Sequence, residues 1–126
     1  MTVEATLYDR LSNFAGLTAL VGNRIYPVVL PEDVTYPAVT YKRMSTVPNV
    51  SCMVEDTGLV RPRFQVAAWG SVYDDLVGIK EQVRSALKRW STTGVQDIFV
   101  VEELDLYDKD TTKIGTAIEV ELIYEE

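Results

Sequence analysis

The chain has 126 residues, 47% of them hydrophobic and 25% charged, which is the composition of an ordinary globular domain. It contains no histidine and one cysteine, Cys52, which excludes histidine-based catalytic triads, histidine zinc sites and an internal disulfide. The net charge of −7 has the wrong sign for a protein that holds a phosphate backbone through clustered lysine and arginine.

The chain lacks the sequence features of membrane or secreted proteins. No apolar run approaches the roughly 18 residues of a membrane span, and the first residues lack the basic and apolar regions of a secretory signal. We therefore expect a protein made and kept in a cytoplasm-like compartment, with no membrane partner. No repeat or linker divides the sequence, so we expect a single domain over residues 1–126.

The first third of the chain combines helical periodicity with proline-rich connections. Apolar residues at helical spacing behind Thr2, the expected N-cap, predict a helix from about Thr2 to Phe14. A further short helical turn over Leu17–Val21 is closed by Gly22. The prolines between Arg24 and Pro37 predict an extended connector, within which Ile25–Tyr26 can form a short edge strand.

Two strands and a long loop are expected next. Residues Ala38–Met44 alternate with period two, as a half-buried strand does, and Leu59–Trp69 predict a second strand. Pro62 indicates that this second strand begins late or lies at an edge there. The loop from Ser45 to about Thr57 is long enough to have a role beyond connection.

The clearest predicted helix follows Ser71, which we take as its N-cap. Its expected buried stripe ends near Trp90 and consists of residues at helical spacing: Leu76, Ile79, Val83, Ala86, Leu87 and Trp90. Gly78 lies inside this helix, where it indicates either close packing or a tolerated glycine.

The last third of the chain is predicted to be a hairpin of two strands, Asp97–Tyr107 and Lys113–Tyr124. The second alternates strictly, so we expect one face of the sheet to be core and the other to be solvated. The order helix, strand, strand, helix, strand, strand predicts an α+β fold. Its four-stranded sheet, antiparallel or mixed, would be covered on one face by two main helices.

The densest cluster of titratable groups lies on the predicted hairpin. Glu103, Asp105, Glu119 and Glu121 have the polar parity of their strands, which predicts one acidic face. Such a face is either solvated and balanced by Arg61, Arg63 and Lys42 on neighbouring strands, or holds a metal or an acid–base pair.

The predicted loop carries apolar residues without an obvious core position: Val47, Pro48, Val50, Met53 and Val54. Exposed apolar side chains on a loop mark contact with another chain; the alternative is a loop folded back over the sheet edge. Cys52, in the same loop, has no basic neighbour that would activate its thiol. We expect no catalytic, cofactor-binding or metal-binding residues, and no enzymatic activity.

As an ordered set, several segments resemble the tail-completion (tail-terminator) proteins of long-tailed bacteriophages, from Leu7 to Tyr124. These segments are Leu17–Pro27, Tyr36–Tyr41, Gly58–Val66 leading through Trp69 into a helix, and Asp105–Asp108 before the final strand. Pro62 departs from the pattern.

The resemblance implies a virion structural protein at the head-proximal end of the tail, assembled in the host cytoplasm. Its copies would form a ring of six that caps the tail tube, ends tube polymerisation and binds the head connector or neck protein. DNA would pass through the ring without specific binding, which suits an acidic protein. Two alternatives remain: a head-side neck or connector adaptor, and a small metal- or ligand-binding α+β domain that uses the strand carboxylates.

Overall fold

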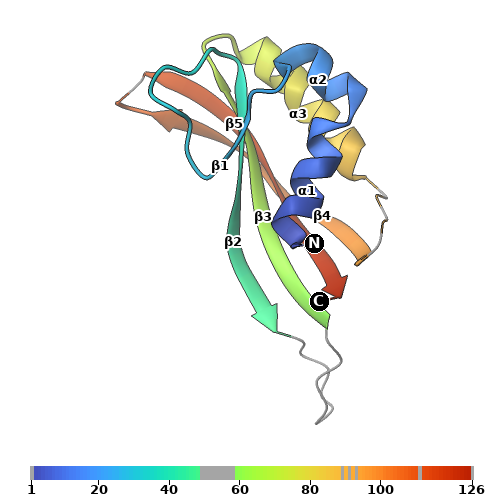
Figure 1. The fold of residues 1–126 in the computed structure, drawn as a ribbon. Coiled ribbons are helices and arrows are strands. Elements are labelled where there is room, and N and C mark those ends of the chain that lie inside the picture. Colours follow the sequence, from blue (N-terminus) through green and yellow to red (C-terminus); the bar gives the residue numbers. More distant parts are fainter. Residues whose placement is uncertain are drawn as a thin grey trace.

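The computed structural model describes residues 2–48, 59–88, 90, 92, 94–110 and 112–125. They form an α+β fold in which the helices lie together on one side of a curved sheet (Figure 1). The elements in chain order are α1 (Val3–Ser12), α2 (Ala15–Val21), β1 (Ile25–Pro27), β2 (Ala38–Pro48), β3 (Leu59–Gly70), α3 (Tyr73–Leu87), β4 (Val95–Asp108) and β5 (Lys113–Glu125).

The sheet has five strands in the order β1-β2-β3-β5-β4. Strand β1 runs parallel to β2, and the other pairs are antiparallel. The α+β class is confirmed, but the expectation of four strands and two main helices omits β1 and α2. The short segments at Leu17–Val21 and Ile25–Tyr26 become α2 and β1, because tertiary packing supports elements too short to be stable alone.

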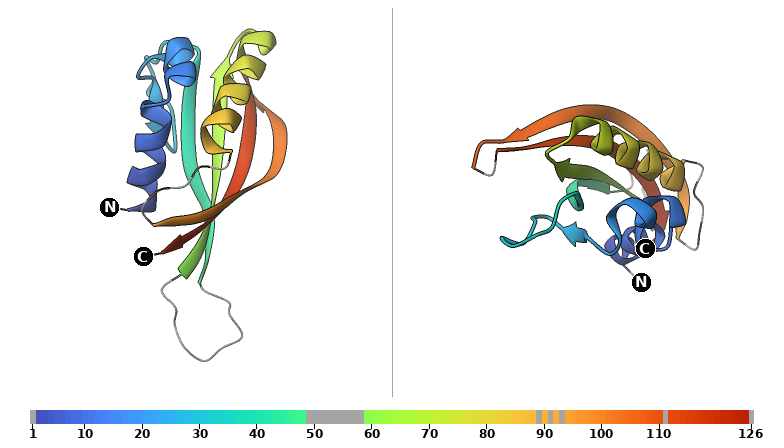
Figure 2. Two further views of the ribbon diagram at one scale, coloured as in Figure 1. Left: turned by 90° about the vertical axis from the view of Figure 1, so that its right-hand side faces the viewer. Right: turned by 90° about the horizontal axis from the view of Figure 1, so that it is seen from above.

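The core lies between the helices and one face of the sheet, which we call the helix-covered face. Strand residues Val39, Phe64, Val66, Ile118 and Val120 project from it and are at most 2% exposed. The expected stripe of α3 packs against them, and Trp90 beyond the helix end is 8% exposed. Figure 2 shows α1 and α2 beside α3 over this face.

The helix ends differ in how well sequence predicts them. Thr2 is the N-cap of α1 as expected, and its Oγ1 accepts a hydrogen bond from the Ala5 amide at 3.1 Å. At α3 the prediction is wrong, since the N-cap is Val72 and no side chain caps the helix. Ser71 instead accepts a hydrogen bond from the Lys113 ammonium at 2.8 Å.

The opposite face of the sheet, which we call the outer face, carries Thr40, Lys42, Gln65, Trp69 and Glu119 among others. The expectation that this side of β5 is solvated is wrong at its middle, where Gly115, Ala117 and Glu119 are buried. Strand β5 lies between β3 and β4, and Trp69 covers Gly115: a Cβ there would come within 2.8 Å of the indole ring. The half-buried Trp69 donates its indole N–H to Thr40 at 3.1 Å.

Strand β3 continues through Pro62 and lies between β2 and β5, contrary to the expected late start or edge position. It pairs with β5 in the same register on both sides of the proline, at Val60–Tyr124 and Arg63–Glu121. On its other side Pro62 pairs with Thr46 of β2. A proline lacks the amide hydrogen that a ladder uses, yet here the flanking pairs hold the strand in line.

Candidate functional site

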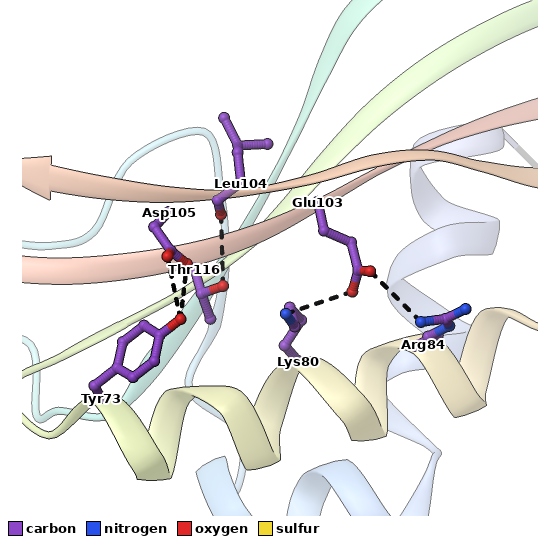
Figure 3. A network of polar contacts seen from close by, with 7 residues as sticks. All are labelled: Tyr73, Lys80, Arg84, Glu103, Leu104, Asp105 and Thr116. Carbon is purple, nitrogen blue, oxygen red and sulfur yellow. Dashed lines mark hydrogen bonds and ion pairs between the residues drawn. The ribbon is translucent and has the colours of Figure 1, made fainter.

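The acidic residues of β4 turn toward the helices. Glu103 pairs with Lys80 and Arg84 of α3, each at 3.5 Å between nitrogen and oxygen. Asp105 accepts a hydrogen bond from the Tyr73 hydroxyl at 3.1 Å, and this bond is the main reason that the pKa of Tyr73 is raised. Figure 3 shows both carboxylates pointing from the strand to the helix. They hold β4 to α3 and do not form part of an open acidic site.

The acidic residues of β5 project from the outer face. Glu121 pairs with Arg61 at 2.7 Å and lies 4.0 Å from Arg63. Glu119 is only 6% exposed, and its cross-strand neighbours are Gln65 on β3 and Glu102 on β4. Burial, followed by the adjoining Glu102 carboxyl, raises the pKa of Glu119, although Arg63 and Gln65 act against the shift.

The prediction of one shared acidic face is therefore wrong, and a β-bulge explains why. Val100 pairs with Val120, but the next pair is Glu102 with Glu119, so Val101 is an extra residue. An extra residue reverses which side chains point to which face. Regular alternation would place Glu103 and Asp105 beside Glu119; the bulge moves them to the helix-covered face.

The predicted contact loop is only partly described. Val47 and Pro48 are the last residues of β2, whose backbone pairs them with Arg61 and Val60 of β3. Val50, Met53 and Val54, like Cys52, lie outside the described residues. The role of the loop as a contact site stays a prediction.

Two exposed apolar segments were not singled out from the sequence. Val28 and Val29, which follow β1, are 62% and 70% exposed, and Phe99, Val100 and Val101 on β4 are 50%, 40% and 39% exposed. A signal for the second was present in the sequence. Four successive apolar residues, Ile98 to Val101, followed by two glutamates break the period of two, as a bulge does.

The first of these segments is held by a tight turn. The Val29 amide donates to the Pro27 carbonyl at 2.7 Å around Val28, whose φ is 66°. A β-branched residue in this region is strained. The segment lies over the outer face and borders a cavity of about 310 Å³, which Tyr36, Lys42 and Trp69 also line.

The chemistry available at these surfaces is that of contact. Among the described residues, no three aspartate, glutamate, cysteine or histidine side chains come together to hold a metal. Glu103, Asp105 and Glu121 are engaged in ion pairs or hydrogen bonds with their own neighbours. Exposed apolar side chains lie beside exposed charged ones, such as Lys42 and Glu102, at the sheet edges.

Comparison with known proteins now decides the family. The family model described as tail completion protein gp17 matches residues 5–125. The chain belongs to this family of phage tail-completion proteins. Its resemblance to such proteins, which the sequence indicated, is thereby confirmed, and the family is one of phage structural proteins.

Solved structures share the fold. A chain in the virion of a native gene transfer agent particle is similar with a TM-score of 0.75 and 16% identity, over 98% of this chain and 95% of that one. The gp17 protein of bacteriophage SPP1 is similar with a TM-score of 0.53 and 18% identity, over 98% and 88%. No curated protein sequence is significantly similar. In the part of the chain that the structure describes, no helix is long and apolar enough to cross a membrane.

Proposed function

We propose that this tail-completion protein caps the head-proximal end of the tail tube as a ring, ends tube polymerisation and provides the surface to which the head joins. The observation that carries the proposal is membership of the family over residues 5–125. On this proposal the protein is a virion component that acts without catalysis, and residues 1–126 work as one domain.

The partners we infer are further copies of this chain in a ring of six, the tail tube protein and a connector or neck protein. Exposed apolar side chains at Val28, Val29 and Phe99–Val101 support repeated contact between proteins, because groups of this kind on a small domain mark interaction sites. The net charge of −7 suits a ring through which DNA passes without being held.

Deletion of the gene from the parent phage tests the proposal. We expect unattached heads together with tails of uncontrolled length in electron micrographs, and complementation from a plasmid should restore joined virions. Joined virions with tails of normal length in the deletion strain would contradict the proposal.

Immunogold labelling of particles from mutants blocked in joining separates a tail role from a head role. We expect label at one end of free tails. Label on free heads only would move the protein to the head side, as a neck or connector adaptor.

A further inference from the structure

The sheet has two open edges in the described part of the chain. Strand β4 is the last strand on one side. On the other side β1 pairs only with Val39–Tyr41 of β2, so β2 itself forms the edge from Lys42 onward. Open edges present backbone N–H and C=O groups that can pair with another strand.

The strand pairing places parts of these two edges at the same level. Lys42 pairs with Gln65, Gln65 with Glu119, and Glu119 with Glu102, which makes one row across four strands. Residues paired across a sheet project from the same face. Lys42 and Glu102 therefore stand on the outer face at opposite ends of one row.

Both edges are interrupted by a bulge beside this row. On β2 the register shifts between Arg43 and Ser45, around Met44; on β4 it shifts between Val100 and Glu102, around Val101. Met44 is 44% exposed and Val101 39%. Bulges hinder the pairing of a whole edge with another strand. Each edge is therefore limited to a short contact segment, and each segment carries an exposed apolar side chain.

The two edges differ in charge. Strand β2 carries two basic residues and no acidic one, Lys42 and Arg43, of which Arg43 pairs with Glu4. Strand β4 carries five acidic residues and no basic one. Contact between two like edges brings like charges together, while contact between unlike edges is favourable. Repeated contact between unlike edges generates a ring when the rotation closes.

We propose that a second copy of this chain is the partner of each edge, with Phe99–Glu102 of one copy lying against Lys42–Ser45 of the next. The inference rests on the proposed ring and names its contact. It puts Lys42 of one copy near Glu102 of its neighbour, which relieves the repulsion between Glu102 and Glu119 within a subunit. Met44 and Val101 bury their exposed surface in the same contact.

Charge reversal at the ends of the row tests the contact. Lys42→Glu and Glu102→Lys should each weaken self-association about tenfold or more, because each places like charges across the interface. An equimolar mixture should regain assembly, since every contact between unlike variants again joins opposite charges. The measurement is sedimentation velocity over a concentration series.

Matched controls change charge away from the edges. Glu81→Lys and Lys88→Glu alter exposed residues of α3 and its C-cap by the same charge, and they should associate as the unaltered chain does. Circular dichroism of every variant checks that the fold is kept. Edge variants that associate like the unaltered chain, or a mixture that does not recover, overturn the proposed contact.

Disulfide cross-linking tests the same contact even when association in solution is weak. In a Cys52→Ser background, Lys42→Cys combined with Glu102→Cys should form covalent multimers on oxidation, whereas either new cysteine alone should stop at a dimer. Absence of multimers from the paired variant overturns the edge contact. Multimers from a chain whose deletion leaves the phage with normal joined virions would instead overturn the proposed function and leave the contact standing.

Discussion

The two faces of the sheet are stabilised by different interactions, although the same strands form both. On the helix-covered face, large apolar side chains such as Phe64 and Ile118 are fully buried under the helices. On the outer face, small residues, one tryptophan and a row of charged groups lie together, with Ala67 and Ala117 buried among them. Close packing of apolar side chains therefore stabilises the helix-covered face. The outer face depends on the fit of small residues under Trp69 and on charged side chains. Substitutions on the two faces test this contrast.

The largest effect is expected at the centre of the helix-covered face. Phe64→Ala removes a side chain with no exposed surface, and filling the space would require the helices to collapse onto the sheet. We expect a loss of about 3–5 kcal/mol in the free energy of unfolding, measured by urea denaturation. A loss well below 1 kcal/mol would mean that this face is not closely packed.

A smaller loss is expected on the outer face at Gly115. In Gly115→Ala the new methyl group lies 2.8 Å from a ring carbon of Trp69, so the indole must move and its hydrogen bond to Thr40 must lengthen. We expect a loss of about 1–3 kcal/mol, with a change in tryptophan fluorescence. An unchanged spectrum and stability would show that Trp69 is free to shift.

The matched glycine on α3 should respond in the opposite direction. A Cβ at Gly78 meets nothing within 4 Å, which rules out close packing as the reason for this glycine. Because alanine is the better helix former, Gly78→Ala should stabilise the protein by about 1 kcal/mol, seen as a higher urea midpoint. Destabilisation would point to a neighbour that this structure does not describe.

The smallest effect concerns pH at Glu119. Its pKa is raised above the ordinary value of 4.5 in the folded protein, so the protonated form favours folding. That contribution is complete below the unfolded pKa and is lost as pH rises through the folded pKa. Glu119→Gln should therefore be more stable than the unaltered chain at neutral pH, with the difference shrinking on acidification.

Denaturation at several pH values measures this difference. Glu81→Gln, on the exposed surface of α3, is the matched control and should leave the pH dependence unchanged. If Glu119→Gln is less stable at neutral pH, then the attraction of the Arg63 guanidinium outweighs burial and Glu102.

Sequence periodicity predicts the elements that bury one face. The stripe of α3 and the alternation of β5 on its helix-covered side are confirmed, because burial against a core imposes a period directly on the residues. The short α2 and β1 exist through packing, which periodicity over a few residues cannot reveal. Ser71 shows a further limit of prediction from sequence. Its hydroxyl accepts a hydrogen bond from Lys113 and does not cap an amide of α3.

The prediction of one acidic face is wrong for a different reason. Its residues do lie on strands, but regular alternation does not hold across Val101, where β4 has a bulge. Whether a run of apolar residues contains a bulge depends on its register with the partner strand β5, which local periodicity does not reveal. The predicted strand Ala38–Met44 likewise ends earlier than β2, which reaches Pro48, because pairing with β3 extends the strand and local propensity does not include that pairing.

The bulge at Val101 decides on which face of the sheet Glu103 and Asp105 lie, and the amino-acid composition of the strand does not. Val100 pairs with Val120 and Glu102 with the adjacent Glu119, so deleting Val101 would make the strand regular and leave Glu103 and Asp105 facing Lys80, Arg84 and Tyr73. Loss of the bulge with Val101 kept in the ladder would instead turn Glu103 and Asp105 to the outer face beside Glu119. A relative with the same residues in β4 but without the bulge would therefore present a different electrostatic potential to the same partner.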